Sequence, residues 1–445
     1  MWLSYKRVAL TAGALFLVGM AVRYPLQTTF PIGGDAVRHV ARASQILTEP
    51  TAILTNSNYP ASIALLASAA ALPLSWPERF IWLTVVGHVA TGLALGWLLY
   101  RHFSWQAAAV GMAGWGLVIT TITRHVEDAT LAQLLSLPIV VLCLERFMAG
   151  RFWVCLGLLL LAGLLHPFSF VYLGLALGLA YLPQLATQSR WQAGVWWVVV
   201  ASLVVLRGAK LWNLPPEDTF DMWHLFSTHG GVLAIIGVFG VVALWQQGQR
   251  GRTTSALLWA GLAALILSLT TAGGLAPIPH RYGSYLVIVI VLFFALGLPW
   301  LLRWFTAPAL QASATGLVFL ILGSASWQAD AFVYNFYESN TNYARVHRDE
   351  LAAMAWLKNN SPTASHVVST TRNRHSEWIP TLAERQWTGV AGTSEMVALS
   401  SATHLAFFTR REGVPDELKH LPVLYENDGA IVLQADPAQP SAPAE

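Results

Sequence analysis

The sequence predicts a mainly α fold, a polytopic bundle of transmembrane helices that ends in a small soluble α/β domain. Only 11% of the 445 residues are charged, 55% are hydrophobic and the mean hydropathy is +0.52, whereas soluble proteins carry roughly 25% charged residues. Apolar runs long enough to cross a bilayer, about 17–25 residues each, recur along most of the chain. Charged residues become frequent only after Asp330.

About eleven apolar runs have spanning length. The first follows Lys6 and Arg7 and has the form of a secretory signal peptide, but no small-residue cleavage site follows it. We therefore interpret it as an uncleaved first helix. The spans are predicted near residues 5–23, 79–100, 105–122, 129–146, 151–166, 168–186, 191–207, 229–246, 254–272, 283–302 and 308–326.

A shorter apolar run over residues 61–74 decides the topology. It either crosses the membrane or forms a re-entrant or in-plane helix. Lys and Arg are in excess in cytoplasmic loops. If this run does not cross and the N-terminus is cytoplasmic, seven arginines fall on the cytoplasmic side: Arg101, Arg146, Arg151, Arg190, Arg250, Arg252 and Arg303. We therefore favour eleven spans, with the C-terminal domain outside the cytoplasm.

The chain is predicted to divide into a membrane domain over residues 1–327, an extracytoplasmic α/β domain over residues 328–436 and a tail over residues 437–445. In the α/β domain, residues 345–359 have helical spacing of apolar side chains. The strand candidates are residues 365–370, 404–409 and 422–434, and the last contains the hairpin turn signal Asn427-Asp428-Gly429. The tail is rich in Pro and Ala and is expected to be disordered.

Several kinds of function are disfavoured. No basic tract carries interleaved aromatic residues, which argues against a nucleic-acid partner. Cys143 and Cys155 lie within apolar runs, so neither a disulfide framework nor a cysteine metal site is expected. Between their ends the spans carry no Asp, Glu, Lys or Arg, which argues against an ion-coupled transporter. His88, the one mid-span candidate, is expected to bond a neighbouring helix rather than to relay protons.

The first predicted outer loop, after the first span, contains Asp35 at the start of a helix. Arg38, a candidate substrate contact, lies opposite a weakly apolar stripe, as in a helix that lies in the membrane interface. The stripe consists of Val37, Val40, Ala41, Ser44 and Leu47. Two interpretations of Asp35 stay open. It is either an N-cap at the positive end of the helix dipole or a carboxylate held above the membrane as a catalytic base.

Two further outer segments carry candidate residues. Arg124-His-Val-Glu-Asp contains His125, Glu127 and Asp128, which bind a divalent cation, or polarise a hydroxyl, or form a solvated loop in which Asp128 caps the next helix. Ile278-Pro-His-Arg-Tyr-Gly contains His280 and Arg281. A guanidinium there suits a lipid-linked phosphate, and the alternative is an interfacial arginine that meets phospholipid headgroups.

These segments together resemble GT-C fold glycosyltransferases, the group of oligosaccharyltransferases, protein O-mannosyltransferases and aminoarabinose transferases. The resemblance rests on an acidic residue in the first outer loop, in-plane helices after it, an acidic site in the next outer loop and a soluble C-terminal domain. Three tail segments also look like those of bacterial and archaeal members: Trp356-Leu-Lys-Asn-Asn-Ser-Pro, Glu377-Trp-Ile-Pro-Thr-Leu-Ala-Glu-Arg and Leu424-Tyr-Glu-Asn-Asp-Gly.

The resemblance implies a bacterial inner-membrane enzyme that transfers a sugar from a polyprenyl phosphate to a glycan, lipid or protein acceptor of the envelope. In this pattern Asp35 is the catalytic base, Glu127 and Asp128 match the second acidic site, and Arg281 holds the donor phosphate. Metal-dependent members have a spaced acidic pair at the second site, whereas this chain has adjacent residues. A divalent cation held by the three carboxylates therefore stays an open possibility.

Two alternatives belong to other classes. One is a transporter or flippase of lipid-linked saccharide, which would move the lipid without transferring its sugar. The other is a non-catalytic membrane assembly protein, which would bind a stoichiometric partner through its C-terminal domain and leave envelope glycans unchanged.

Overall fold

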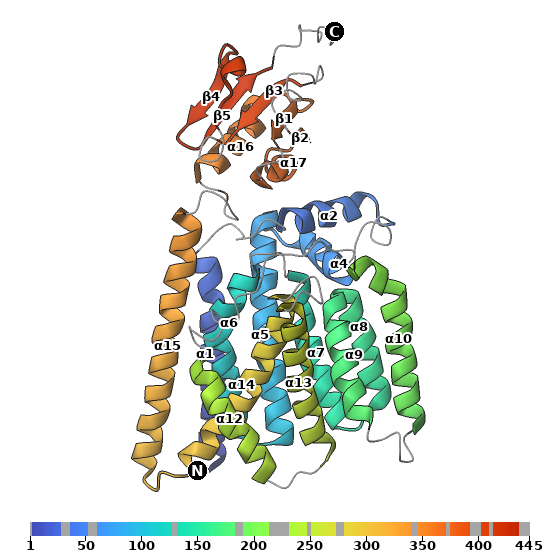
Figure 1. The fold of residues 1–445 in the computed structure, drawn as a ribbon. Helices are drawn as coiled ribbons and strands as arrows, with labels where there is room; N and C mark the ends of the chain where they lie inside the picture. The colour runs from blue at the N-terminus through green and yellow to red at the C-terminus, as the bar shows by residue number, and fades with distance from the viewer. Residues whose placement is uncertain are drawn as a thin grey trace.

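The computed structural model is a bundle of long helices with a small α/β domain at one end (Figure 1). We call this the domain end of the bundle. Helices α5, α7, α9 and α14 begin there, and α6 and α8 end there. The structure describes residues 2–27, 36–51, 60–126, 131–182, 190–212, 231–246, 251–272, 280–339, 346, 348–370, 374–391, 402–408 and 413–435.

The bundle elements follow the predicted apolar runs closely. They are α1 (Trp2–Gln27), α5 (Trp76–His102), α6 (Trp105–Val126), α7 (Leu131–Met148), α8 (Phe152–Leu165), α9 (Pro167–Tyr181), α10 (Arg190–Trp212), α12 (Gly231–Gln246), α13 (Arg252–Ala272), α14 (His280–Leu302) and α15 (Pro308–Ser339). Across the domain end lie α2 (Ala36–Thr48) and α4 (Pro60–Ser68), followed by a 3-10 turn, η1 (Ala69–Ala71).

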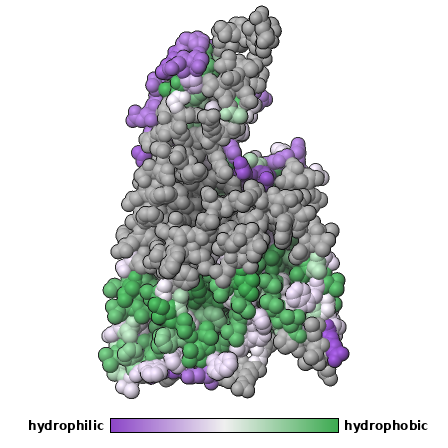
Figure 2. Space-filling view, viewed as in Figure 1, coloured by the Kyte–Doolittle hydropathy of each residue, from purple (hydrophilic) through white to green (hydrophobic). Residues whose placement is uncertain are grey.

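Length and composition make this a membrane protein. Among the residues whose side chains the structure describes, four helical segments are long and apolar enough to cross a bilayer: Tyr5–Arg23, Trp76–His102, Leu131–Met148 and Gly283–Leu302. The other apolar segments measured over these residues are shorter, so the number of eleven spans stays a prediction. Large apolar side chains such as Ile235, Trp245 and Leu320 are exposed on the bundle. On the face drawn in Figure 2, hydrophobic residues cover the part of the bundle away from the α/β domain, and hydrophilic residues lie at its far end, at the domain end and on the α/β domain.

The apolar run over residues 61–74, on which the predicted topology depends, forms a short helix. Helix α4 has nine residues, which makes it about 14 Å long at 1.5 Å per residue. The apolar core of a bilayer is roughly 30 Å thick, so α4 is too short to cross it. Its Ser62 hydroxyl donates a hydrogen bond of 2.8 Å to the carbonyl of Leu165, at the end of α8. This bond ties α4 to the domain end of the bundle.

The predicted apolar stripe of α2 is only partly correct. Val37 and Val40 are buried as expected, but Leu47 is 53% exposed, and Ala41 and Ser44 are exposed as well. The buried face instead includes Ala36, Ala43 and His39, whose ring lies 6.5 Å from that of Phe80 on α5. The face turned inward is set by packing on α4 and α5, and a histidine with an aromatic partner is accommodated there.

Helices α12 and α14 cross at close range. A Cβ atom on Gly240 would collide with the carbonyl oxygen of Phe293, and one on Gly297 would collide with that of Ile236. Small residues let membrane helices approach until their backbones touch, where dispersion contacts replace the hydrophobic effect that lipid cannot supply. This crossing fixes the position of α14 within the bundle.

A buried carboxylate joins α5 and α7 at the opposite end of the bundle. Glu145 is fully buried, with carboxylate oxygens 3.1 Å from Arg146 Nε, 3.5 Å from Arg101 Nε and 3.4 Å from His102 Nε2. A buried charge is tolerated when cations compensate it. Cys143 and Cys155 pack nearby as free thiols with their sulfurs 3.4 Å apart.

The predicted domain boundary at residue 327 falls within α15, which continues to Ser339. The drop in hydropathy near Gln328 marks where the helix leaves the apolar layer and not where it ends. No Gly or Pro occurs between Gln328 and Ser339 to stop it. The α/β domain therefore follows a helix that runs along the bundle and ends level with α2 (Figure 1).

The α/β domain contains a five-stranded mixed sheet with strand order β2-β1-β3-β5-β4. Strands β1, β2 and β3 are parallel, and β5 is antiparallel to β3 and β4. The elements are α16 (Arg348–Asn360), β1 (His366–Thr370), η4 (Arg374–Trp378), α17 (Ile379–Leu382), β2 (Gln386–Val390), β3 (His404–Phe407), η5 (Asp416–Leu418), β4 (Val423–Asn427) and β5 (Ala430–Gln434).

The predicted β4–β5 hairpin is confirmed, and one edge strand was missed. Asn427 Oδ1 accepts hydrogen bonds from the backbone N–H groups of Gly429 and Ala430, at 3.0 and 2.8 Å, which closes the predicted turn. Strand β2 was not predicted because Gln386-Trp-Thr-Gly-Val is short and only half apolar. It forms by pairing in parallel with β1, a partner distant in sequence.

One histidine makes the stability of the α/β domain depend on pH. His404 on β3 is 8% exposed, and burial, with a smaller contribution from the Arg385 guanidinium, lowers its pKa below the usual value. Below pH ~6.5 the His404 side chain binds a proton more readily in the unfolded chain than in the folded domain. Acid should therefore destabilise the folded domain. Limited proteolysis of the purified protein at pH 5.5 and 7.5 should show faster cleavage of the domain at pH 5.5.

The His404→Gln variant should lose part of this pH dependence, because it keeps a polar side chain without the titration. His420→Gln, at an exposed position of the same domain, is the matched control and should behave as wild type. Equal pH dependence in wild type and His404→Gln would contradict the assignment.

Candidate functional site

The described helices that adjoin the candidate residues in sequence begin or end at the domain end. Helix α2 begins directly after Asp35, α7 begins three residues after Asp128, and α14 begins at His280. Asp35, Glu127 and Asp128 lie outside the described residues. His125, His280 and Arg281 lie within described helices, at the end of α6 and the start of α14.

The register of α6 against α14 brings two of these segments together. Gly114 of α6 faces Phe294 of α14, and Gly111 faces Ala295, so the helices are antiparallel. Eleven residues beyond Gly114, α6 reaches His125. Eleven residues before Phe294, α14 has Gly283, two residues after Arg281. The backbone at His125 therefore lies beside the start of α14.

Arg38 contacts the α/β domain. Its Nε lies 3.3 Å from Glu377 Oε2 and its Nη2 lies 3.4 Å from Glu377 Oε1. The two residues are 339 positions apart in the sequence, and Glu377 belongs to η4. The role of Arg38 as a substrate contact stays a prediction. The ion pair itself links α2, which begins after Asp35, to the α/β domain.

Reversing one charge of this pair should loosen the α/β domain from α2. The pair is partly exposed, at 50% for the Arg38 side chain and 23% for that of Glu377, so the expected effect is modest, roughly 0.2–1 kcal/mol. Arg38→Glu should increase protease cleavage between α15 and α16 severalfold, and the double variant Arg38→Glu/Glu377→Arg should restore protection. Arg42→Glu, one turn further along α2, is the control. Failure of the double variant to recover would rule out the coupling.

A chain of buried polar side chains lies beneath the domain end. Ser136 Oγ of α7 and Ser169 Oγ of α9 are 2.5 Å apart, and Ser169 Oγ is 2.6 Å from Tyr285 Oη of α14. His166 Nδ1, at the turn between α8 and α9, lies 3.3 Å from the same phenol oxygen. All four side chains are at most 1% exposed. We call these residues the polar chain.

Tyr285 is the centre of the polar chain. Besides its hydrogen bonds, its ring stacks on Tyr172 of α9, with centroids 4.5 Å apart and planes at 10°. The Tyr172 hydroxyl donates to the carbonyl of Ala260 on α13, at 3.2 Å. Sequence reasoning missed Ser136, Ser169 and Tyr285, because isolated Ser and Tyr residues in apolar helices carry no motif. The only available signal was their polarity in spans that are otherwise almost without charge.

The described residues hold no metal-binding cluster: among them, no three His, Cys, Asp or Glu side chains are grouped closely enough to bind an ion. The three carboxylates considered for a divalent cation lie outside this part of the chain.

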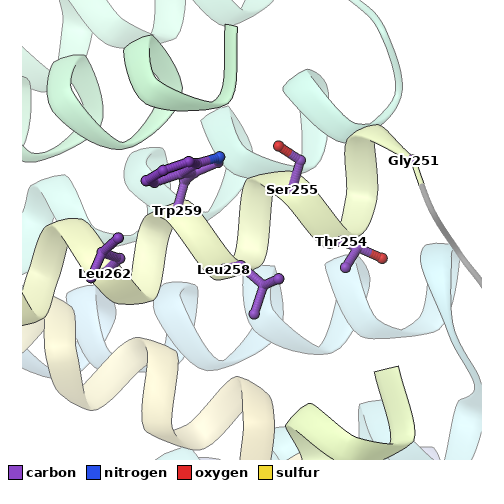
Figure 3. A pocket seen from close by; sticks show the side chains of 6 residues that line it. All are labelled: Gly251, Thr254, Ser255, Leu258, Trp259 and Leu262. Carbon is purple, nitrogen blue, oxygen red and sulfur yellow. The ribbon is translucent and has the colours of Figure 1, made fainter. Parts of the chain in front are cut away.

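A groove of about 410 Å³ lies at the opposite end of the bundle, along the first turns of α13. Figure 3 shows that its wall consists of one helix, with the Trp259 ring over it. Its lining residues are Gly251, Thr254, Ser255, Leu258, Trp259 and Leu262. None of the described residues that line it is charged, and it lies near the start of α13, far along the bundle from the starts of α7 and α14. It therefore plays no part in the candidate site.

Comparison with known proteins gives a likeness of fold. No protein-family model matches the sequence, and no curated protein matches it. ArnT from Cupriavidus metallidurans bound to undecaprenyl phosphate is similar in structure, with a TM-score of 0.62 and 12% identity over 100% of this chain and 99% of that chain. The apo structure of the same ArnT gives 0.59 with the same identity and coverage. This chain has the GT-C fold.

A second protein of known structure shows the same likeness of fold. The Archaeoglobus fulgidus oligosaccharyltransferase, tethered with an acceptor peptide, matches with a TM-score of 0.52 and 12% identity, covering 91% of this chain and 69% of that chain. The resemblance inferred from the acidic outer loops and the C-terminal domain is thus confirmed for the fold. The assigned roles of Asp35, Glu127, Asp128 and Arg281 stay predictions.

Proposed function

We propose that this chain is an inner-membrane glycosyltransferase that takes a sugar from a polyprenyl phosphate donor. The observation that carries the proposal is the full-length likeness to ArnT. The alignment with the structure of ArnT bound to undecaprenyl phosphate covers 100% of this chain and 99% of that chain. A donor with an isoprenoid tail also explains why this chemistry would belong to a membrane bundle: the headgroup sits at the bilayer surface while the tail stays in lipid.

In the proposed reaction Asp35 takes the proton from an acceptor hydroxyl, and the acceptor oxygen attacks the anomeric carbon of the sugar. The bond between that carbon and the phosphate oxygen breaks, and polyprenyl phosphate leaves. Arg281, with His280 and His125 beside it, supports the phosphate as its negative charge develops. Glu127 and Asp128 orient the acceptor or hold a divalent cation. The acceptor is a glycan, lipid or protein of the envelope.

The proposed orientation places the domain end outside the cytoplasm. Arg101, Arg146, Arg151, Arg190 and Arg303 lie at the opposite end, in the terminal turns of helices or in the connections between them, and positive charge favours the cytoplasmic side. The α/β domain would then cover the site from outside and help to select the acceptor.

Mass spectrometry of envelope glycans and glycolipids in a deletion strain tests the function. One sugar should disappear from one envelope component and return when the wild-type chain is supplied. Unchanged glycans would overturn the proposal. Loss of lipid flipping with intact sugar transfer would point to a flippase, and co-purification of a stoichiometric partner without a glycan change would point to an assembly role.

A further inference from the structure

The polar chain connects the helices that begin with the candidate phosphate-binding and acidic residues. Arg281 precedes Tyr285 by one turn of α14, and Asp128, with Glu127 before it, lies three residues before the start of α7, which carries Ser136 in its second turn. Ser169 of α9 bridges the two, since its hydroxyl contacts both Ser136 and Tyr285. The starts of α7 and α14 are therefore held at a set separation by two hydrogen bonds.

This connection is built where polar groups are costly. The four side chains are almost fully inaccessible and lie among membrane helices, where each unbonded hydroxyl would be left without water. An apolar contact between α7, α9 and α14 would hold the helices together equally well. A hydrogen-bonded chain differs from such a contact because it specifies distances and directions to within a few tenths of an ångström.

We propose that Tyr285 is a positioning residue that sets the start of α14, and with it Arg281, for a lipid-linked phosphate. Three contacts fix the phenol: Ser169 Oγ, His166 Nδ1 and the stacked ring of Tyr172. Ser136 anchors Ser169 in turn, so the chain transmits the position of α7 to α14. This inference rests on the proposed function, and it adds residues that do not themselves touch the donor.

The Tyr285→Phe variant removes the phenol oxygen and keeps the stacked ring. We expect it to weaken binding of undecaprenyl phosphate to the detergent-purified full-length protein by about three- to tenfold, the effect of one buried hydrogen bond in a membrane protein. Binding of undecaprenol, which has the same tail and no phosphate, should not change. If Tyr285 had only a structural role, the variant would bind both ligands more weakly by the same factor. The ratio of the two affinities is therefore the informative quantity.

Tyr172→Phe is the matched control. It also removes one buried phenol oxygen from the same ring stack, but that oxygen bonds to α13 and not to the polar chain. Both variants should lower the unfolding temperature, and only Tyr285→Phe should change the phosphate preference. If both variants change the phosphate preference, or if neither variant does, the proposed positioning role of Tyr285 is wrong.

Ser169→Ala provides a second variant, which decides the matter if Tyr285→Phe does not fold. It interrupts the chain between α7 and α14 and should reduce the phosphate preference to a similar degree. Combined with Tyr285→Phe, it should add little, because both variants break the same connection. If Ser169→Ala keeps the wild-type preference, the positioning role is overturned. A wild-type protein that binds undecaprenyl phosphate no better than undecaprenol would instead overturn the proposed donor, and this inference with it.

Discussion

Replacing Asp35 by Asn should abolish sugar transfer while the protein remains folded. If Asp35 is the base, the amide cannot accept the proton of the acceptor hydroxyl, and loss of a general base typically slows a reaction about 10²–10⁴-fold. The deletion strain supplied with Asp35→Asn should therefore lack the same sugar as the strain without the gene. Mass spectrometry of the envelope component and immunoblotting of the membrane fraction measure the two parts of this result.

The control for Asp35→Asn is Asp218→Asn, which makes the same chemical change in a segment to which we assign no role. It should restore the sugar fully. Binding of undecaprenyl phosphate should persist in Asp35→Asn, because the base acts on the acceptor and not on the donor phosphate. Full transfer by Asp35→Asn would show that this carboxylate only caps α2, the structural alternative considered for it.

Replacing Gly297 by Leu should prevent the bundle from folding. The new Cβ would collide with the backbone carbonyl of Ile236, and a backbone in a membrane helix cannot move aside as a flexible side chain can. Overpacking a core costs about 1–3 kcal/mol where side chains can adjust, so this substitution should exceed that range. Size-exclusion chromatography in detergent should show aggregate in place of a monodisperse peak, and Gly240→Leu should behave in the same way.

The control for Gly297→Leu is Gly316→Leu on α15, where no atom lies within 4 Å of an added Cβ. This glycine is exposed on the bundle. Leucine there improves helix propensity and adds an apolar side chain on a surface in contact with lipid. Its yield and chromatographic profile should equal those of wild type. A monodisperse Gly297→Leu protein would mean that α12 and α14 do not cross at this point.

The domain boundary illustrates how far the sequence could be interpreted. The last apolar run was placed near residues 308–326 and the boundary at 327, whereas α15 continues to Ser339. Hydropathy reports where a segment leaves lipid, and it contains no information on whether the helix continues in water. The signals that end helices are Gly, Pro and capping residues, and the sequence from Gln328 to Ser339 contains neither Gly nor Pro.

The buried face of α2 is a second feature that the sequence pattern predicted only in part. An apolar stripe through Leu47 was expected, but the buried face includes His39, which packs against Phe80. Periodicity identifies a face only when the polar and apolar sides differ clearly. In a helix that lies on other helices at the membrane surface, a partner such as Phe80 decides which side turns inward. The Arg38–Glu377 pair, which spans 339 positions, could not be inferred from either segment alone.

The sequence by itself determined the membrane class, the positions of the long helices and the β4–β5 hairpin, because each depends on residues close together in the chain: sustained hydropathy in the first two cases and the Asn-Asp-Gly turn in the third. Only the tertiary structure decided which distant groups meet. It brought Tyr285 to Ser169, paired Arg38 with Glu377, and placed Gly240 and Gly297 where two backbones touch. These contacts depend on the register and crossing of helices, which are set by packing over the whole bundle and leave no local pattern in the sequence.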